Sequence, residues 1–483
     1  IYIKNSGTFP QAKTLTLEWV GLFPGKRESR RFNGLYTLTQ QDVINQSTHY
    51  DAVAYGGWAI DLHPADGVYA GGNGCHQWHS KGVYQIPYRC YVTPDLDNLF
   101  VGGRIISSSH VANGTTRVMC TSALGGEVIG RAASICLSKG YKPIDLVDRD
   151  RIGLLQSLLV KNGNFIPGIA VAVEDNLADS AEISVSSVLE LDDLPADGTW
   201  FGLDYPIAQL IPVNGKVPVV RMNVKADNAT RLVMELRSSS KSENYTPDTI
   251  DAVLEFDLKK DENEIVADFS YSYATPRYAF ICLMKNPEIS VPMSGRLVTG
   301  LTAVYNYINP AVSNFGKQVP PEGIGVEEFE FWCPKRRPES KNIAMSFAPP
   351  LASFNSENLR NSYYRPYIGT NAWVAAFDDA RPEVCFKWNG RKQIKTIILY
   401  FDTDTDQAME TVQMGHFDAC VPTCYREYII RDSEGKELYH ITGNHQTLNV
   451  LELDQPVTTD AIYVNFVRPC GDVCPGLMGV YVC

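Results

Sequence analysis

Residues 98–140 read NLFVGGRIISSSHVANGTTRVMCTSALGGEVIGRAASICLSKG, and this stretch decides the fold of the first part of the chain. An apolar run ends in the glycine pair Gly102 and Gly103, and a polar loop follows. Small residues then recur at the spacing of a helix. The stretch predicts a short buried strand, a glycine turn, a polar loop and a helix over residues 121–139, which Gly140 would end.

The composition is that of an ordinary globular protein. The chain has 483 residues, of which 44% are hydrophobic and 20% are charged, and a chain of this length normally divides into about three domains. The formal net charge of -12 gives no electrostatic reason to bind nucleic acid. No run of apolar residues is long enough for a membrane span, so we expect none.

The sequence pattern changes along the chain, and we predict a multidomain α/β plus all-β fold. Residues 1–167 hold most of the glycine-rich turns and a second helical pattern over 148–160. Residues 168–310 contain short apolar runs between turn residues, which favours a β-sandwich. Residues 311–330 are rich in Pro and Gly and indicate a linker. Residues 331–483 indicate a second, jelly-roll-like sandwich. The expected strands are 181–191, 217–224, 231–236, 252–258, 278–284, 395–401, 425–431, 447–453, 461–467 and 480–483.

Four segments precede the opening stretch in order. They are GKRESRR at 25–31, LYTLTQQD at 35–42, DLHP at 61–64 and YQIPYR at 84–89. Together with the NLFVGGR, SSSH and RVM segments and the glycine-faced helix, they resemble the C-terminal, flavin-contacting part of the FAD-dependent oxidoreductase family. The resemblance implies FAD as the cofactor and transfer of a hydride from a substrate to the flavin.

The resemblance also implies which residues lie beside the cofactor. The N-terminus of the helix would direct its N–H groups at the pyrimidine edge of the flavin, which gains negative charge on reduction. The alternative is a buried helix whose glycines serve only packing. The implied cofactor-binding residues are Gly102, Gly103, Arg104, Thr121, Gly125 and Gly126.

Two histidines are candidates for proton transfer beside the flavin, because histidine changes its charge near neutral pH. We expect His110 to face the ring and His63 to take part in the chemistry. In the alternative, both are structural, and Asp61 only orients the loop of His63.

Two further side chains complete the candidate catalytic set. Arg117 would bind a substrate carboxylate or stabilise reduced flavin; the alternative is a salt bridge to Glu28 or Asp61. Tyr88 would donate a hydrogen bond at the flavin face; the alternative is a place in the core.

The sequence departs from the family at the dinucleotide motif. Such flavoproteins begin with a strand, a G-x-G-x-x-G turn and a helix that hold the adenosine diphosphate. The nearest glycine cluster, residues 71–74, has the wrong spacing. We therefore expect the N-terminal half of the flavoprotein module to come from another segment or from a separate chain. The part at hand should then expose an apolar face.

The chain begins at Ile1 without an initiator Met, so we expect that an earlier segment was removed, either by processing or by the choice of the segment. The sequence leaves the location open and favours an exported protein over a cytoplasmic one.

Metal ligation is considered at two places. The segment CHQWH at residues 75–79 offers good zinc ligands but has no fourth ligand nearby. Asp402, Asp404 and Asp406 alternate as in a calcium loop, without its Gly and closing Glu. We predict no metal site at either.

Four of the twelve cysteines form the close pairs Cys420/Cys424 and Cys470/Cys474. We expect disulfides or simple thiols there rather than a zinc site, and a disulfide would staple one end of the sandwich.

The last part of the chain resembles the discoidin-like, or galactose-binding-like, jelly-roll sandwich. The resemblance rests on IILYFD at 397–402, YREYII at 425–430, DSEG at 432–435 and GVY at 479–481. It implies a scaffold or a glycan-binding domain that uses its end loops, for which the candidate contacts are Tyr363, Tyr364, Trp373 and Arg426.

Two functions are therefore open. The first is an FAD-dependent oxidoreductase, present as a partial chain, acting on a small-molecule or carbohydrate-related substrate. The second is a non-catalytic carbohydrate-binding or scaffold protein in which the flavoprotein part is structural. A flavin absorption band would separate them.

Overall fold

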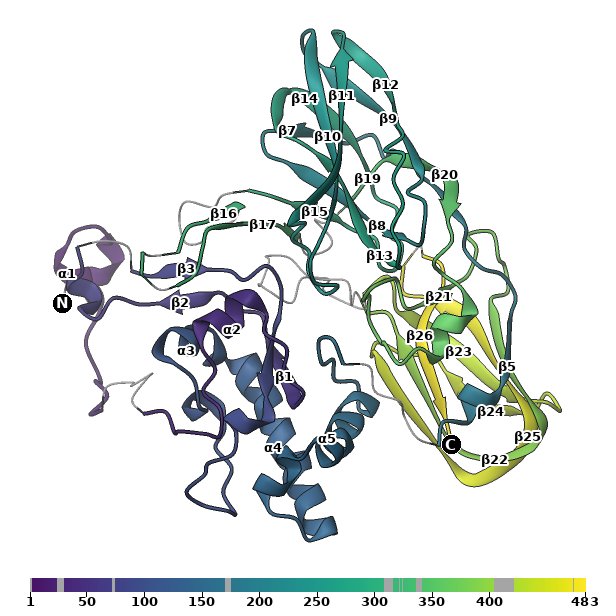
Figure 1. The fold of residues 1–483 in the computed structure, drawn as a ribbon, viewed down its shortest axis with the longest axis horizontal. Helices are drawn as coiled ribbons and strands as arrows, with labels where there is room; N and C mark the ends of the chain where they lie inside the picture. The colour runs from purple at the N-terminus through teal and green to yellow at the C-terminus, as the bar shows by residue number, and fades with distance from the viewer. Residues whose placement is uncertain are drawn as a thin grey trace. The chain divides into compact units, whose positions relative to one another are not determined.

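A computed structural model describes residues 2–23, 30–71, 74–169, 175–307, 316–320, 322–323, 325–335, 341–403, 421–471 and 473–483. The chain divides into two compact units, Ile1–Arg31 and Phe32–Cys483. Figure 1 gives the element labels. None of the helices in the described ranges has the length and apolar character that a membrane crossing requires.

The first unit contains α1 (Tyr2–Asn5) and a 3-10 turn, η1 (Pro10–Thr14), followed by an extended run. This run exposes its apolar side chains: Leu17 is 75% exposed, Trp19 is 79% exposed and Leu22 is 91% exposed. Several large apolar side chains exposed in succession usually mark a surface that another segment or molecule covers. The run is therefore the most apolar exposed segment in the described part of the first unit.

The α/β part of the second unit sets helices against short strand pairs. Strand β1 (Ala52–Gly56) pairs antiparallel with β4 (Tyr84–Pro87), and β2 (Ile60–Leu62) pairs with β3 (His76–Trp78). The helices are α2 (Gln40–Asn45), α3 (His110–Thr116), α4 (Met119–Lys139) and α5 (Arg149–Lys161), and the 3-10 turns are η2 (Gly67–Tyr69), η3 (Tyr88–Cys90), η4 (Gly103–Ile105) and η5 (Pro143–Val147).

Both helices expected from the sequence are present within two residues of their expected bounds. Helix α4 ends at Gly140, which has φ of 69° and provides the left-handed cap that the sequence indicated. Its buried face carries small residues, among them Val128 and Ala132, while α5 buries Leu155 and Leu159. These faces close one apolar core against β1 and β4.

The middle part is a sandwich of two sheets around one large core. The first sheet has the order β11-β10-β13-β8-β15-β18, with β8 (Ile207–Val213), β10 (Thr230–Ser238), β11 (Thr249–Leu258), β13 (Arg277–Leu283), β15 (Ala303–Tyr305) and β18 (Cys333–Pro334). The second has β6 (Leu191–Leu194), β7 (Trp200–Leu203), β9 (Val219–Ala226), β12 (Asp261–Ala267), β14 (Asn286–Ser294), β19 (Asn342–Ile343) and β20 (Met345–Leu351). Strand β9, expected over 217–224, buries every second residue, as a strand with one face on a core does.

The C-terminal part is one sheet whose two longest strands carry bulges and enclose a second β core. These two strands are β22 (Glu383–Phe401) and β25 (Leu448–Pro469), which pair with each other in the middle of the sheet. Its other strands are β5 (Glu182–Val185), β21 (Trp373–Val374), β23 (Tyr425–Asp432), β24 (Glu437–Ile441) and β26 (Gly476–Val482), and the turns η6 (Leu177–Ser180) and η7 (Ser356–Arg360) flank it. The α/β plus all-β fold class is thus confirmed.

The strand pairing crosses the expected boundaries. The single strand expected over 181–191 is wrong: β5 pairs with β22 of the C-terminal sheet, whereas β6 pairs with β20 of the middle sandwich. Strands β16 (Gly316–Gln318) and β17 (Phe329–Phe331) pair with each other inside the expected linker. The boundaries at 167, 310 and 330 stay predictions.

The α/β part is tied to the middle sandwich by a pair of amides. Gln46 Nε2 donates to Asn244 Oδ1 at 2.6 Å, and Asn244 Nδ2 donates back to Gln46 Oε1 at 2.9 Å. Both side chains are buried. Each amide donates one hydrogen bond to the other and accepts one from it, so these buried polar atoms need no water between them. An ion pair between Lys81 and Asp248, 3.1 Å apart, lies on the same two parts.

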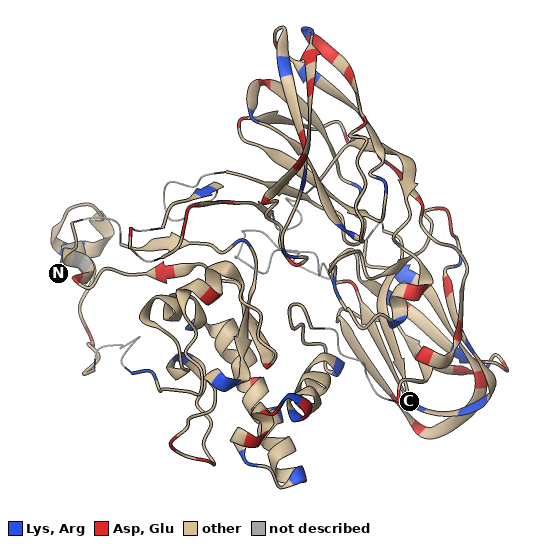
Figure 2. Cartoon of the chain, in the orientation of Figure 1, with Lys and Arg blue, Asp and Glu red and all other residues tan. Residues whose placement is uncertain are grey.

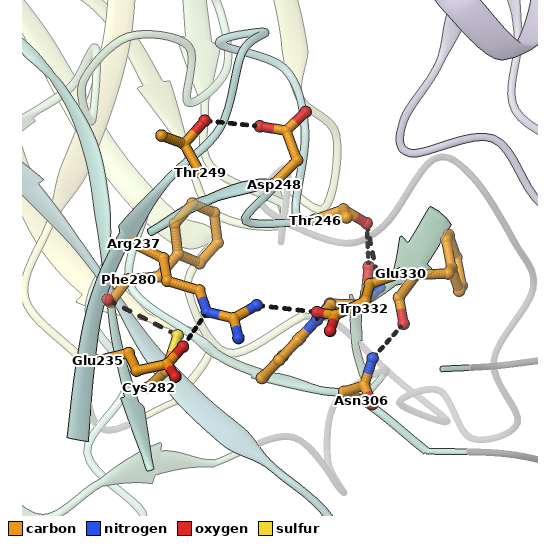
Figure 3. A network of polar contacts seen from close by, with 11 residues as sticks. Glu235, Arg237, Thr246, Asp248, Thr249, Phe280, Cys282, Asn306, Glu330 and Trp332 are labelled. Atoms are coloured by element: carbon orange, nitrogen blue, oxygen red, sulfur yellow. Dashed lines mark hydrogen bonds and ion pairs between the residues drawn. The ribbon is translucent and has the colours of Figure 1, made fainter. Parts of the chain in front are cut away.

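A buried arginine joins β10 to β17 (Figure 3). Arg237 donates to Glu235 at 2.6 Å and to Glu330 at 2.8 Å. Trp332 donates from its indole Nε1 to Glu330 at 3.0 Å, and its backbone N–H donates to Thr246 Oγ1 at 3.0 Å. The guanidinium is 7% exposed, so its charge depends on these carboxylates. Elsewhere in Figure 2, acidic and basic residues are intermixed over the described parts.

We expect Arg237→Ala to lower the free energy of unfolding by about 2–4 kcal/mol, because it leaves the Glu235 carboxylate largely buried without its cation. The midpoint of urea unfolding would measure the loss. Arg231→Ala is the control, since Arg231 makes exposed pairs with Glu255 and Asp257, which solvent screens. Equal midpoints for the two variants would contradict a structural role for the buried network.

Candidate functional site

The glycine turn lies between a strand-like segment and helix α4. Gly102 is extended, with φ of -143°, and a Cβ placed on it would lie 2.6 Å from Ile129 Cδ1 of α4. Gly103 has φ of +66°, in the left-handed region, and a Cβ on it would meet nothing within 4 Å. The first glycine therefore allows the helix to pack closely, and the second faces open space.

Helix α4 begins at Met119 without a side-chain cap. Its N-cap residue, Val118, offers no hydrogen-bonding side chain, and Met119 is 87% exposed. In contrast, α3 is capped by Ser109, whose Oγ accepts from Ala112 N at 3.2 Å. A helix of 21 residues with an uncapped, outward N-terminus presents N–H groups and positive partial charge to whatever lies in front of it.

Three buried polar atoms around the junction of α3 and α4 have no hydrogen-bond partner within the described protein. They are Thr116 Oγ1 on α3, Ser122 Oγ on α4 and Asp61 Oδ1 on β2, which packs against α3. Buried polar atoms are normally paired, so unpaired ones need an explanation. A bound molecule with donors and acceptors would pair them, and in this respect the residues present fit a polar group such as the flavin ring.

The structure brings His63 and Arg117 together on Asp61. His63 Nε2 lies 3.3 Å from Asp61 Oδ2, and His63 Nδ1 lies 3.0 Å from the carbonyl oxygen of Gly74. Arg117 Nη2 donates to the backbone carbonyl of Asp61 at 2.8 Å and lies 3.7 Å from Oδ2. The pairing of Arg117 with Asp61 is the structural alternative that the sequence left open. His63 is the more exposed partner, at 42% of its side chain.

His110 lies at the other end of the same helix from Arg117. It is the exposed first residue of α3, and Arg117 is the C-cap. A helix of 7 residues is about 10 Å long. The two side chains therefore belong to opposite ends of α3, and only Arg117 joins the His63 group.

The remaining predicted residues divide between core and surface. Tyr88 is fully buried and donates its hydroxyl to the carbonyl of Pro143 at 2.9 Å, and burial raises its pKa above the ordinary value. Tyr88 thus occupies the core position that was its alternative. Thr121 is buried on α4, and Arg104 is exposed.

The two helical glycines are not equivalent. A Cβ on Gly125 would lie 2.9 Å from Tyr91 Cε1, so a protein ring already packs against this glycine. A Cβ on Gly126 would meet nothing within 4 Å. Both glycines were predicted to contact the cofactor, but only Gly126 has open space beside it.

Sequence reasoning missed the polar interior of α3. Asn113 donates from Nδ2 to the carbonyl of Arg104 at 3.2 Å, and Thr115 donates to the carbonyl of Trp58 at 2.5 Å. A Cβ on Gly114 would lie 3.1 Å from backbone atoms of Asp61. The signal was available, because the run NGTT is too polar for an ordinary buried helix face.

The histidines of the CHQWH segment stack on aromatic rings. His76 stacks on Trp78, and the buried His79 stacks on Phe331 with ring centroids 4.4 Å apart. Within the described ranges, no group of three or more His, Cys, Asp or Glu side chains is arranged to hold a metal ion. Asp404 and Asp406 lie outside those ranges.

The cysteine pairs differ from each other. Cys424 is buried as a free thiol, and burial raises its pKa to about 12. Cys470 is disulfide-bonded, and Cys420 lies outside the described residues.

One of the candidate glycan contacts is wrong. Trp373 is fully buried and donates its indole N–H to the carbonyl of Ser187 at 2.9 Å, so it belongs to the core. Tyr364 is partly buried and stacks on Tyr400, with ring centroids 3.5 Å apart and planes within 2°. Tyr363, Tyr364 and Arg426 stay predictions.

The comparisons with known proteins agree with the first resemblance. Residues 3–159 match the family model of the FAD dependent oxidoreductases. The resemblance of this part of the chain to that family is thereby confirmed. No curated protein matches the chain.

Similar solved structures are carbohydrate-binding modules. The family 32 module of Streptococcus pneumoniae EndoD has 10% identity and a TM-score of 0.21 over 27% of this chain and 86% of its own. The family 32 module of C. perfringens NanJ, solved with galactose, has 9% identity and a TM-score of 0.20 over 27% and 85%. Similarity at this level supports no statement about what this chain binds.

The adjacent glycines of α4 allow a matched test of the packing. We expect Gly125→Ala to destabilise the protein by about 1–3 kcal/mol, because the new methyl group meets the Tyr91 ring. Gly126→Ala should instead stabilise it by about 0.5–1 kcal/mol, since alanine is the better helix former and the space is open. Thermal unfolding measures both. Shifts of the same sign would contradict the described packing.

Proposed function

We propose that the chain is an FAD-dependent oxidoreductase whose flavin lies at the junction of α3 and α4. Two observations carry the proposal together: the open glycine turn at Gly103, which packs along α4, and the uncapped N-terminus of α4 with unpaired buried polar atoms beside it. The family match over residues 3–159 supports it.

The residues of the chain would each supply one part of the site. The first N–H groups of α4 would bind the electronegative pyrimidine edge, and a helix N-terminus stabilises such charge by about 0.3–2 kcal/mol. Gly103 would let the backbone lie against the ring, with Gly102 and Arg104 beside it. When bound, FAD supplies hydride acceptance from a substrate.

The two histidines, His63 and His110, would transfer protons beside the flavin. His63 can hold or pass a proton at Nε2, and Asp61 Oδ2 orients the ring at 3.3 Å. Arg117 fixes Asp61 from the other side through its backbone carbonyl. His110, at the exposed start of α3, would face the ring of the flavin.

The site would be completed by a segment that carries the G-x-G-x-x-G motif, in the same polypeptide or in a separate chain. The exposed apolar run that includes Leu17, Trp19 and Leu22 supports this. Covering this apolar surface with a partner surface would stabilise it by roughly 25 cal/mol for each Å² removed from water.

The substrate would be a small or carbohydrate-related molecule that gives up a hydride, and the setting would be an exported protein. The β-rich parts behind the flavin module favour carbohydrate surroundings over other substrate classes only by analogy.

Gly103→Val tests the flavin site. We expect at least a tenfold weaker hold on flavin, equivalent to about 1.4 kcal/mol, because valine is strained at φ of +66° and fills the space of the ring. Flavin absorbance per protein, measured on protein purified with the motif-bearing segment, gives the result. Gly435→Val is the control, since Gly435 has φ of +80° and open space in the β23–β24 turn. Normal flavin content in Gly103→Val would remove the cofactor from this turn.

His110→Ala tests the role of the exposed histidine. We expect unchanged flavin content and a roughly 100-fold slower anaerobic bleaching of the flavin by the substrate, which is the usual scale of general acid–base help. Stopped-flow absorbance measures the rate. His76→Ala, which removes a histidine stacked on Trp78, is the control. An unchanged bleaching rate would leave His110 structural.

The second candidate is a non-catalytic carbohydrate-binding or scaffold protein in which the α/β part is structural. The specific observation in its favour is that Tyr88 and Gly125 make protein contacts where the sequence expected cofactor. A colourless protein, even with the motif-bearing segment present, would favour this function.

A further inference from the structure

Two cavities on the β-rich part adjoin each other. The first, of about 370 Å³, lies on the second sheet of the middle sandwich and is lined by Trp200 of β7 and Asp193 of β6. The second, of about 730 Å³, lies between the 295–297 turn and the end loops of the C-terminal sheet, with Arg296 and Phe377 in its lining. Ala196, in the turn that joins β6 to β7, lines both cavities, and the two together are called the groove.

Each cavity holds one exposed aromatic ring with a cation against it. Trp200 is 38% exposed, and Lys225 Nζ lies 4.0 Å from its ring centroid. Phe377 is 44% exposed, and the Arg296 guanidinium lies 4.3 Å from its ring centroid. A cation over a ring face is attracted to it. The groove therefore presents one partly exposed aromatic ring in each cavity, and these two rings are called its platforms.

Two carboxylates in the lining of the second cavity are held in place by the protein. Asp379 accepts hydrogen bonds from Ser186 at 2.5 Å and from Ser187 at 2.6 Å. Burial raises the pKa of Asp379, but these hydrogen bonds outweigh burial and hold the pKa below its ordinary value. Asp197 pairs with Lys341 at 2.6 Å. A ligand would find these carboxylates already oriented, which lowers the entropy cost of binding.

The two cavities carry opposite charges in their linings. Asp193 lines the first cavity and Arg296 lines the second. Burial raises the pKa of Asp193, and the positive charge of Arg296 opposes that rise.

One wall of the second cavity is pinned. Cys470 is disulfide-bonded, its N–H donates to the carbonyl of Cys424 at 2.9 Å, and Gly471 N–H donates to the carbonyl of Pro422 at 3.2 Å. A Cβ on Gly471 would lie 2.5 Å from Pro422 Cβ, so the two end loops are in direct contact. The groove wall that they build is preformed.

From this lining we infer that the groove binds a neutral polysaccharide chain, with one sugar on Trp200 and another on Phe377. Sugar rings present flat C–H faces to aromatic rings and rows of hydroxyl groups to fixed carboxylates, amides and guanidinium groups. The lining holds five carboxylates and two guanidinium groups, which disfavours an acidic polymer. The inference is independent of the flavin proposal, because no residue of the α/β part lines the groove.

Affinity electrophoresis through neutral soluble polysaccharides tests the inference, with galactomannan, xyloglucan, mixed-linkage glucan and xylan as probes and polygalacturonate as the acidic comparison. We expect at least one neutral polymer to retard the full chain. Trp200→Ala and Phe377→Ala should each weaken that binding roughly tenfold. Tyr463→Ala is the control, a partly exposed aromatic residue on β25 outside both cavities.

Titration calorimetry with oligosaccharides of the retarding polymer tests the continuity of the groove. A hexasaccharide should bind at least tenfold more tightly than the disaccharide, because only the longer ligand reaches both platforms. No retardation by any neutral polymer, preference for polygalacturonate, binding of a protein partner in place of polysaccharide, unchanged binding by both variants, or equal affinity of the two oligosaccharides would overturn the inference. Flavin content measured on the same preparations separates this outcome from failure of the flavin proposal.

Discussion

The pairing of β5 with β22 is the constraint on which the arrangement of the β-rich parts depends. Four residues that precede the middle sandwich in sequence add a strand to the C-terminal sheet, nearly 200 positions from their partners. Strand β20 then returns the chain to β9 and β6 after β18 has closed the other sheet. The middle sandwich is therefore inserted between two pieces of the C-terminal part, and the groove lies between the sandwich and the end loops of the C-terminal sheet.

Periodic segments of the sequence were predictable, and pairings between distant segments were not. Helix α4 was recognisable because small residues recur along it and Gly140 can adopt the left-handed cap. Strand β9 was recognisable because a short apolar run lies there between turn residues. Nothing in residues 181–191 indicates that its first half pairs with β22 and its end with β20, since the choice of partner depends on contacts with residues far away in sequence. The β22–β25 bulges are hidden for the same reason.

The candidate site was predictable in its residue types but only partly in its geometry. The glycine turn and the start of α4 follow from the local sequence. Whether an aromatic residue faces a ligand or a core does not, because both uses favour the same apolar surroundings. The rings of Tyr88 and Trp373 are both buried, and each residue donates a hydrogen bond from its polar atom to a backbone carbonyl. The grouping of His63, Asp61 and Arg117 needed the packing of α3 on β2, which the closely packed Gly114 permits.

The reciprocal amide pair between Gln46 and Asn244 has a consequence for modification of the chain. Asn244, Tyr245 and Thr246 form an Asn-x-Thr acceptor sequence for N-linked glycosylation. The Asn244 amide is 5% exposed and uses its nitrogen on Gln46, while a Cβ on Gly82 would lie 1.9 Å from its oxygen. An oligosaccharide attached to that nitrogen would replace one of its two hydrogens and would not fit between the α/β part and the sandwich. In a cell that glycosylates exported chains, this acceptor sequence would therefore be modified only before the two parts dock, and docking would protect it afterwards.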